Sequence, residues 1–253
     1  MEVVAVLLAG VAAGTINTVV GSGTLITFPT LLAFGLPPVS ANVSNNIGLV
    51  FGSVTGTWGY RSELEGQRPY LVRLAPLSLL GSIAGAVLLL RLPAAAFAAI
   101  VPVLIGISLV LVLTQTRISA ALGRRRERAG RPSRRAGPVA GVGVLLAGVY
   151  GGYFGAAQGV LLVGLLGALL EESLQRVNAL KNFLSAVVNG VAAVTFLVVR
   201  PSAANWAVVG LIAAGSVLGG LLGARVGRRL PPNGLRAVIV TVGLVAIARL
   251  VLA

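Results

Sequence analysis

The polar side chains inside the apolar runs of this sequence form two groups that suit anion binding. The first group is Asn17 with the segment Gly21-Ser22-Gly23-Thr24, which interrupts an apolar run. A glycine break leaves the next helix with unpaired backbone N–H groups and a partial positive charge at its start. Such a helix end binds anions, and at membrane depth irregular backbone persists only where it is buried in protein or lines a cavity. Alternatively, the glycine break is only a kink that lets neighbouring helices pack closely.

The second group is a polar stripe on one predicted helix of the second half. Its members are Asn178, Lys181, Asn182, Ser185 and Asn189. Spacings of three, four and seven residues place them on one face of a helix. Lys181 is the only lysine of the chain, and a lysine at the centre of a membrane helix costs about 2.5–3.5 kcal/mol. We expect it to be the positive partner of an anionic substrate; the alternative is an interfacial position beside Glu171 or Glu172.

A matching polar cluster begins the corresponding span of the first half. Its members are Asn42, Ser44, Asn45 and Asn46. Asn42 and Asn46 precede Asn178 and Asn182 by the same number of residues. The glycine break also has a counterpart, which we place at Gln158-Gly159. The predicted substrate-binding residues are Asn17, the two breaks and the two clusters without Asn189.

The elements that position these residues are organised as two similar halves. For example, the segment Leu7-Leu8-Ala9-Gly10-Val11 recurs as Leu145-Leu146-Ala147-Gly148-Val149. We expect residues 1–116 and 138–253 to be transmembrane repeats, joined by a basic cytoplasmic linker at 117–137. Repeats of this kind are typical of secondary transporters.

In each half, the sequence predicts an opening pair of helices followed by three full spans. The second helix of each pair is too short to span a membrane. The predicted runs are 3–20, 24–36, 41–60, 70–90 and 94–116, then 139–157, 160–170, 178–199, 205–224 and 235–253. The expected fold is therefore an all-α membrane protein with two repeats of a broken or re-entrant opening pair plus three transmembrane helices.

The arginines favour repeats that are inverted relative to each other. If each opening pair enters the membrane and returns to the same side of it, all arginines except Arg91, Arg200 and Arg249 lie on one side of the membrane. Cytoplasmic loops of membrane proteins carry the excess of Lys and Arg. This arrangement places the linker inside and the N-terminus outside.

The composition indicates that lipid is the solvent. Of the 253 residues, 57% are hydrophobic and only 10% are charged, with a mean hydropathy of +0.97; soluble domains carry about 25% charged residues. The chain has no Cys, His or Asp, which removes Cys or His metal ligands and Ser–His or Cys–His catalytic pairs. We expect no cofactor and no metal. The net charge of +14 follows from arginines in loops, so we expect no nucleic-acid partner.

Several of these residues carry a family resemblance. The opening Ile16-Asn17, the break Gly21-Ser22-Gly23-Thr24 with Pro29, and Ala41-Asn42-x-Ser44-Asn45 resemble the TauE/SafE family of sulfite and organosulfonate exporters. The duplicated apolar halves around a basic loop are similar too, so the resemblance covers nearly the whole chain. It implies a multi-pass transporter for sulfur-containing or related small anions, with the glycine-rich breaks near the substrate path.

The sequence departs from the family pattern at both breaks. The usual glycine run is reduced to Gly21-Ser22-Gly23, and Gln158-Gly159 replaces the second glycine-rich break without a following proline. Where a Thr-Ser pair usually follows the alanine, this chain has Ser44-Asn45 and Leu180-Lys181. We therefore expect the two halves to contribute unequally to the site.

The sequence is compatible with three alternative functions. The first is a multi-pass transporter that moves a small anion, a sulfur oxyanion or organosulfonate, across the cell membrane, with no enzymatic activity. The second is a structural or assembly subunit, which would tolerate the loss of Lys181. The third is an intramembrane enzyme with Lys181 and Ser185, four residues apart, as a Ser–Lys pair.

Overall fold

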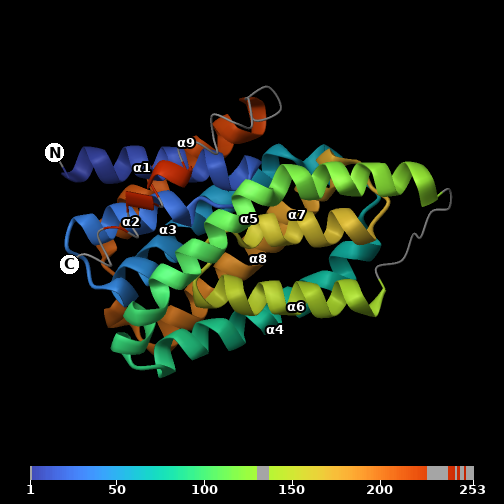
Figure 1. Ribbon diagram of the computed structural model, residues 1–253. Helices are drawn as coiled ribbons and strands as arrows, with labels where there is room; N and C mark the ends of the chain where they lie inside the picture. Colours follow the sequence, from blue (N-terminus) through green and yellow to red (C-terminus); the bar gives the residue numbers. More distant parts are fainter. Residues whose placement is uncertain (1, 130–136, 227–238, 243, 246–247, 249–253) are drawn as a thin grey trace.

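The structure, a computed structural model, describes residues 2–129, 137–226, 239–242, 244–245 and 248, and the regular elements among them are helical (Figure 1). The longer helices are α1 (Glu2–Val19), α2 (Thr24–Ala33), α3 (Pro38–Gly59), α4 (Arg68–Arg91), α5 (Ala94–Ala129), α6 (Pro138–Tyr153), α7 (Gln158–Leu169), α8 (Leu174–Val199) and α9 (Trp206–Val226). Two short 3-10 helices, η1 (Arg61–Leu64) and η2 (Pro201–Ala203), lie in the connections after α3 and α8. The prediction of an all-α chain is confirmed.

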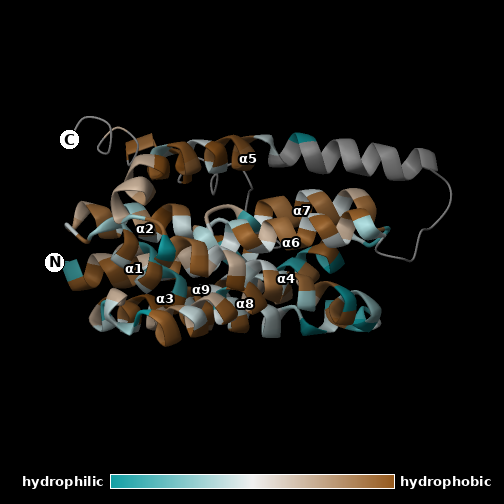
Figure 2. Cartoon of the chain, turned by 90° about the horizontal axis from the view of Figure 1, so that it is seen from below, coloured by the Kyte–Doolittle hydropathy of each residue, from teal (hydrophilic) through white to brown (hydrophobic). Residues whose placement is uncertain are grey.

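Several helices have the length and composition of membrane spans. They are α1, α4, the Ala94–Thr114 part of α5, α8, and α9 as far as Arg225. Apolar residues can cover these helices because lipid surrounds them, and Figure 2 shows hydrophobic residues along most of their length. The helices α2, α6 and α7 are apolar but shorter. The chain is therefore a multi-pass integral membrane protein.

Two spans begin earlier than their apolar runs. Helix α3 begins at Pro38, ahead of the predicted start at residue 41, because proline is favoured in the first helical turn. Helix α8 begins at Leu174, since Ser173 caps it by accepting a hydrogen bond from the Arg176 backbone N–H at 3.3 Å. Both polar clusters consequently lie at least one turn inside a helix.

The structure also corrects the predicted boundaries around the linker and the second break. Helix α5 continues past residue 116 to Ala129, through a stretch rich in Ala and Arg, which favour helix. The second break is not Gln158-Gly159: α6 ends at Tyr153 and α7 begins at Gln158, so the interruption lies at 154–157. The predicted run at 235–253 lies largely outside the described residues, and the described positions within it are helical.

Glycines bring the opening helix of each half against a helix of the other half. Gly14 of α1 lies against Ser216 of α9, and a Cβ at this position would stand 2.5 Å from the Ser216 carbonyl oxygen. Gly152 of α6 lies equally close to the backbone of Ser82 in α4. Small residues let membrane helices approach this closely and bond across the interface. The Ser216 hydroxyl donates to the Gly48 carbonyl of α3 at 2.9 Å, and the Ser82 hydroxyl donates to the Val188 carbonyl of α8 at 2.7 Å.

The two opening pairs enter the bundle from opposite ends. In Figure 1, the start of α1 and the connection from α2 to α3 lie at the end near the N-terminus. The start of α6 and the connection from α7 to α8 lie at the other end. As a result, the two breaks come together within the bundle rather than at its surface.

Candidate functional site

The two helix breaks touch through their backbones. The Gly159 N–H donates to the Gly21 carbonyl at 3.0 Å. A Cβ on either glycine would overlap the other residue's backbone, so this approach requires glycine on both sides. Gly21 has φ of +89° and Ala157 has φ of +59°, so both breaks turn through left-handed backbone. Ala157 adopts this conformation against the preference of an L-residue, as is common near functional sites.

The two short helices point their N-terminal ends into this contact. The first hydrogen bonds of the α2 turn run from Leu25 N–H to the Ser22 carbonyl at 3.1 Å and from Ile26 N–H to the Gly23 carbonyl at 2.9 Å. Earlier N–H groups of such a turn are left for other partners, and with the helix dipole they favour an anion. Helix α7 presents the same kind of end at Gln158.

Two polar side chains at these ends are buried and have no hydrogen-bond partner among the described residues. They are the Ser22 hydroxyl, 0% exposed, and the Gln158 amide nitrogen, whose residue is 3% exposed. A buried polar group without a partner costs free energy, so native proteins pair such groups with protein, water or a ligand. Their position at the start of α2 and α7 therefore indicates a place for a polar ligand.

Lys181 lies beside the same contact and is completely buried. Its Cδ is close enough to Gly159 that a Cβ there would stand 2.8 Å away. Its ammonium group donates to the Asn17 carbonyl at 2.8 Å and to the Thr18 carbonyl at 3.0 Å. These are carbonyls of the last turn of α1, which carries a partial negative charge that a cation stabilises. An ammonium has three donors, so one N–H remains for another acceptor.

The polar stripe of α8 thus caps the broken end of α1. Asn178 and Asn182 each donate from the side-chain amide to the Thr18 carbonyl at 3.3 Å, beside Lys181. The first half makes a matching bond: the Asn42 amide donates to the Tyr153 carbonyl, at the end of α6, at 2.9 Å. Each polar cluster therefore satisfies the carbonyl end of the other half's opening helix.

The remaining first-half residues brace the start of α2. Asn45 donates to the Thr24 hydroxyl at 3.1 Å and accepts a hydrogen bond from the Thr27 hydroxyl. Asn46 is 5% exposed, and its amide oxygen has no partner among the described residues. A Cβ at Gly155, in the second break, would stand 3.9 Å from the Asn46 amide nitrogen. Asn45 and Asn46 therefore lie where the first short helix meets the second break.

Asn17 joins the two clusters through a serine that the sequence reasoning missed. The Asn17 amide donates to the Ser53 hydroxyl at 3.2 Å, and the Asn189 amide donates to the same oxygen at 2.9 Å. Ser53 precedes Asn189 by the same offset that separates Asn42 from Asn178. That offset was the signal that could have identified it.

Two predicted site residues have other surroundings. The Ser44 hydroxyl accepts a hydrogen bond from the Asn205 backbone N–H at 2.8 Å and so holds the connection before α9. Ser185 is buried one turn beyond Lys181 on α8. The Lys181 ammonium donates to backbone carbonyls rather than to Ser185. The described part of the structure therefore contains no hydrogen bond between Ser185 and Lys181.

The alternative of an interfacial Lys181 beside a glutamate is wrong. Glu172 pairs with Arg176, with 2.5 Å between the carboxylate oxygen and Nε. Lys181 instead lies in the interior, because the carbonyl end of α1 supplies acceptors for its ammonium. Among the buried residues that the structure describes, Lys181 is the only one that is an Asp, Glu, Lys or Arg.

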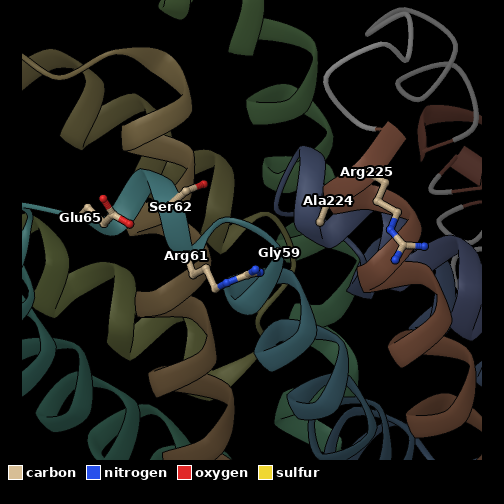
Figure 3. Close-up of a pocket in the computed structure, with 6 residues that line it drawn as sticks. All are labelled: Gly59, Arg61, Ser62, Glu65, Ala224 and Arg225. Atoms are coloured by element: carbon tan, nitrogen blue, oxygen red, sulfur yellow. The ribbon is translucent and has the colours of Figure 1, made fainter.

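A separate cavity of about 750 Å³ opens at one end of the bundle (Figure 3). Arg61 of η1 and Arg225 of α9 line it on either side of Gly59 and Ala224, with Ser62 and Glu65 nearby. Arg61 also lies over the exposed Trp58 ring, 4.4 Å from its centroid. The cavity belongs to the surface, and its lining shares no residue with the helix breaks. We place the site at the breaks, where the buried unpaired polar groups are.

Comparisons with known proteins agree with the architecture. The family described as "Sulfite exporter TauE/SafE" matches residues 6–250. The chain is 27% identical over 239 residues to the "Probable membrane transporter protein YfcA" of Escherichia coli strain K12, covering 94% of this chain and 85% of that protein. It is 31% identical over 93 residues to the "Probable membrane transporter protein ORF9" of Sinorhizobium sp, covering 37% of this chain and 36% of that protein. No solved structure gives a significant match.

Proposed function

The chain belongs to the sulfite exporter TauE/SafE family, and on that premise we propose that it moves a small anion, a sulfur oxyanion or organosulfonate, across the cytoplasmic membrane. Buried Lys181 carries the proposal, because its side chain lies against Gly159, where the N-terminal ends of the two short helices meet, and its ammonium lies at the adjacent end of α1. Intramembrane ionisable residues mark substrate or ion paths. The site would lie between the two halves, near the helix breaks.

The hydrogen-bond donors around the break suit an oxyanion. The ammonium of Lys181 has a third N–H, and the Ser22 hydroxyl and Gln158 amide nitrogen lack partners among the described residues. A sulfonate or sulfite group offers several oxygen acceptors on one small centre, which would satisfy donors at the starts of α2 and α7 and on α8. Substrate would thus replace hydrogen bonds that the protein alone does not make.

We also propose that residues 1–116 and 138–253 are inverted repeats. Support comes from equivalent bonds made in both directions: Asn42 caps the end of α6, and Asn178 caps the end of α1. The opposite entry of the two opening pairs in Figure 1 agrees with this symmetry. Rocking of one half against the other around a fixed central site is the usual way in which such repeats alternate access.

Arginines in or next to the connections gather at one end of the bundle, as the proposed topology requires. Gln67 donates to the Arg176 carbonyl at 3.0 Å, and Gly59 packs on Ala224. These contacts bring the α3–α4 connection, the start of α8 and the end of α9 to one end of the bundle, together with Arg61, Arg176 and Arg225. We assign this end to the cytoplasm by the excess of positive charge.

Ligand-dependent stability of the purified chain in detergent tests the proposal. A ligand that binds only the native state raises apparent stability by mass action. We expect sulfite and methanesulfonate to raise the Tm, whereas uncharged dimethyl sulfone, of similar shape, should not. An anion that gives a shift should then cross the membrane of proteoliposomes containing the protein. Absence of any anion-dependent shift would instead support a structural or assembly subunit, which also predicts that Lys181→Ala has no effect on transport by its partners.

A further inference from the structure

The charge at the breaks limits the charge of the ligand. Among the glutamates whose side chains the structure describes, Glu2 lies at the start of α1 and the others lie in connections, and none of these is buried. The buried polar residues around the breaks are amides and hydroxyls, apart from Lys181. Among the residues that the structure describes, the formal charge of this interior therefore comes from one ammonium group.

The helix ends do not change that balance. Two N-terminal ends, those of α2 and α7, bring partial positive charge to the breaks. Two C-terminal ends, those of α1 and α6, bring partial negative charge to the same region. At each break one C-terminal helix end lies next to one N-terminal helix end, so their partial charges largely cancel. The positive charge of Lys181 remains.

We infer that the site takes singly charged oxyanions, of the sulfonate or hydrogensulfite type, in preference to dianions; this inference rests on the proposed function. A monoanion beside Lys181 leaves the buried interior neutral, with the Ser22 hydroxyl and Gln158 amide nitrogen as uncharged donors. A dianion of the same shape leaves one uncompensated negative charge in a medium of low dielectric constant. Burying an unpaired charge is far more costly than burying a paired one.

Pairs of anions with similar shape and different charge test this inference. Sulfamate and methanesulfonate are monoanions, while sulfate and thiosulfate are dianions of similar size. In the thermal-shift assay with the full purified chain, we expect the monoanions to reach half-maximal stabilisation at roughly 100-fold lower concentration. Equal or tighter binding of sulfate and thiosulfate would overturn the charge inference and leave anion transport standing. Binding of neither kind would overturn the proposed function itself.

A variant assigns the selectivity to Lys181. Lys181→Gln removes the charge but keeps a hydrogen-bond donor, and we expect it to weaken monoanion binding roughly 10-fold or more. Arg61→Gln is the matched control, because it removes one positive charge at the exposed surface cavity. The control should bind anions within about twofold of the parent, since exposed charges are screened. Equal weakening in both variants would show that net charge, not Lys181, sets the affinity. The comparison of anions on the unaltered chain remains decisive if Lys181→Gln does not fold.

Discussion

Replacing Gly159 with alanine tests whether the contact between the breaks holds the site together. Gly159 has an ordinary helical conformation at the start of α7, so alanine alone would favour the helix by about 0.5–1 kcal/mol. The added Cβ, however, would overlap the Gly21 Cα, stand 3.0 Å from the Gly21 oxygen and lie 2.8 Å from the Lys181 Cδ. Carbon atoms normally pack about 3.5–4.0 Å apart, so the two breaks must separate.

The cost follows from what that separation disturbs. Overpacking a close-packed interior costs about 1–3 kcal/mol. Loss of the Gly159 N–H bond to the Gly21 carbonyl, now 3.0 Å, costs about 1 kcal/mol. After the gain in helix propensity is subtracted, we expect Gly159→Ala to lower the free energy of unfolding by about 1–3.5 kcal/mol. Displacement of Lys181 should also reduce anion binding.

Gly190→Ala in α8 is the matched control. Gly190 also lies within a helix, but a Cβ there would meet nothing within 4 Å. This variant should be as stable as the parent or up to about 1 kcal/mol more stable. Unfolding of both variants can be followed by denaturant titration in detergent, and anion binding by thermal shift. If Gly159→Ala matches Gly190→Ala in stability and in anion binding, the contact between the breaks does not organise the site.

Two further predictions concern the second break and the topology. Ala157→Gly should leave the free energy of unfolding within about 1 kcal/mol of the parent, because relief of the left-handed backbone, about 1–2 kcal/mol, is offset by the chain entropy of glycine, about 0.5–1 kcal/mol, and by loss of a fully buried methyl group, about 0.8 kcal/mol. A loss of more than about 1 kcal/mol in denaturant titration would contradict the strained backbone. The chain has no cysteine, so single cysteines at exposed Ser62 and Ser202 can be labelled with an impermeant maleimide on intact cells. We expect Ser202→Cys to be labelled and Ser62→Cys to be protected until the cells are opened, and labelling of both without opening would refute the proposed orientation.

The sequence predicted which polar side chains share a helix face better than it predicted their hydrogen-bond partners. It indicated both polar clusters because helical periodicity within a few turns is enough to place Asn178, Lys181 and Asn182 on one face. It assigned that face to the substrate. In the structure the same side chains first satisfy the carbonyl end of α1, which the sequence could not show because the acceptor is backbone from the other half of the chain.

The second break shows how local signals can misplace a boundary. Gln158-Gly159 was predicted as the interruption because glycine and a polar residue stood between two apolar runs. The turn instead falls at 154–157, with Ala157 in left-handed backbone and Gln158 already in α7. An alanine gives no sequence signal for that conformation. Two residues later, the Gly159 backbone contacts Gly21 and donates a hydrogen bond to its carbonyl, a long-range contact that local sequence does not signal.

The sequence alone determined that the chain needs lipid around it, that it is helical, and where the polar residues stand along the chain. Composition fixes whether a chain can bury its apolar surface in water or needs lipid, and periodicity is a property of neighbouring residues. Only the tertiary structure decided that Gly21 touches Gly159, that Lys181 is buried without a carboxylate, and that Ser53 joins Asn17 to Asn189. These contacts join distant parts of the chain, and they depend on how closely glycine-bearing helices from the two halves can approach.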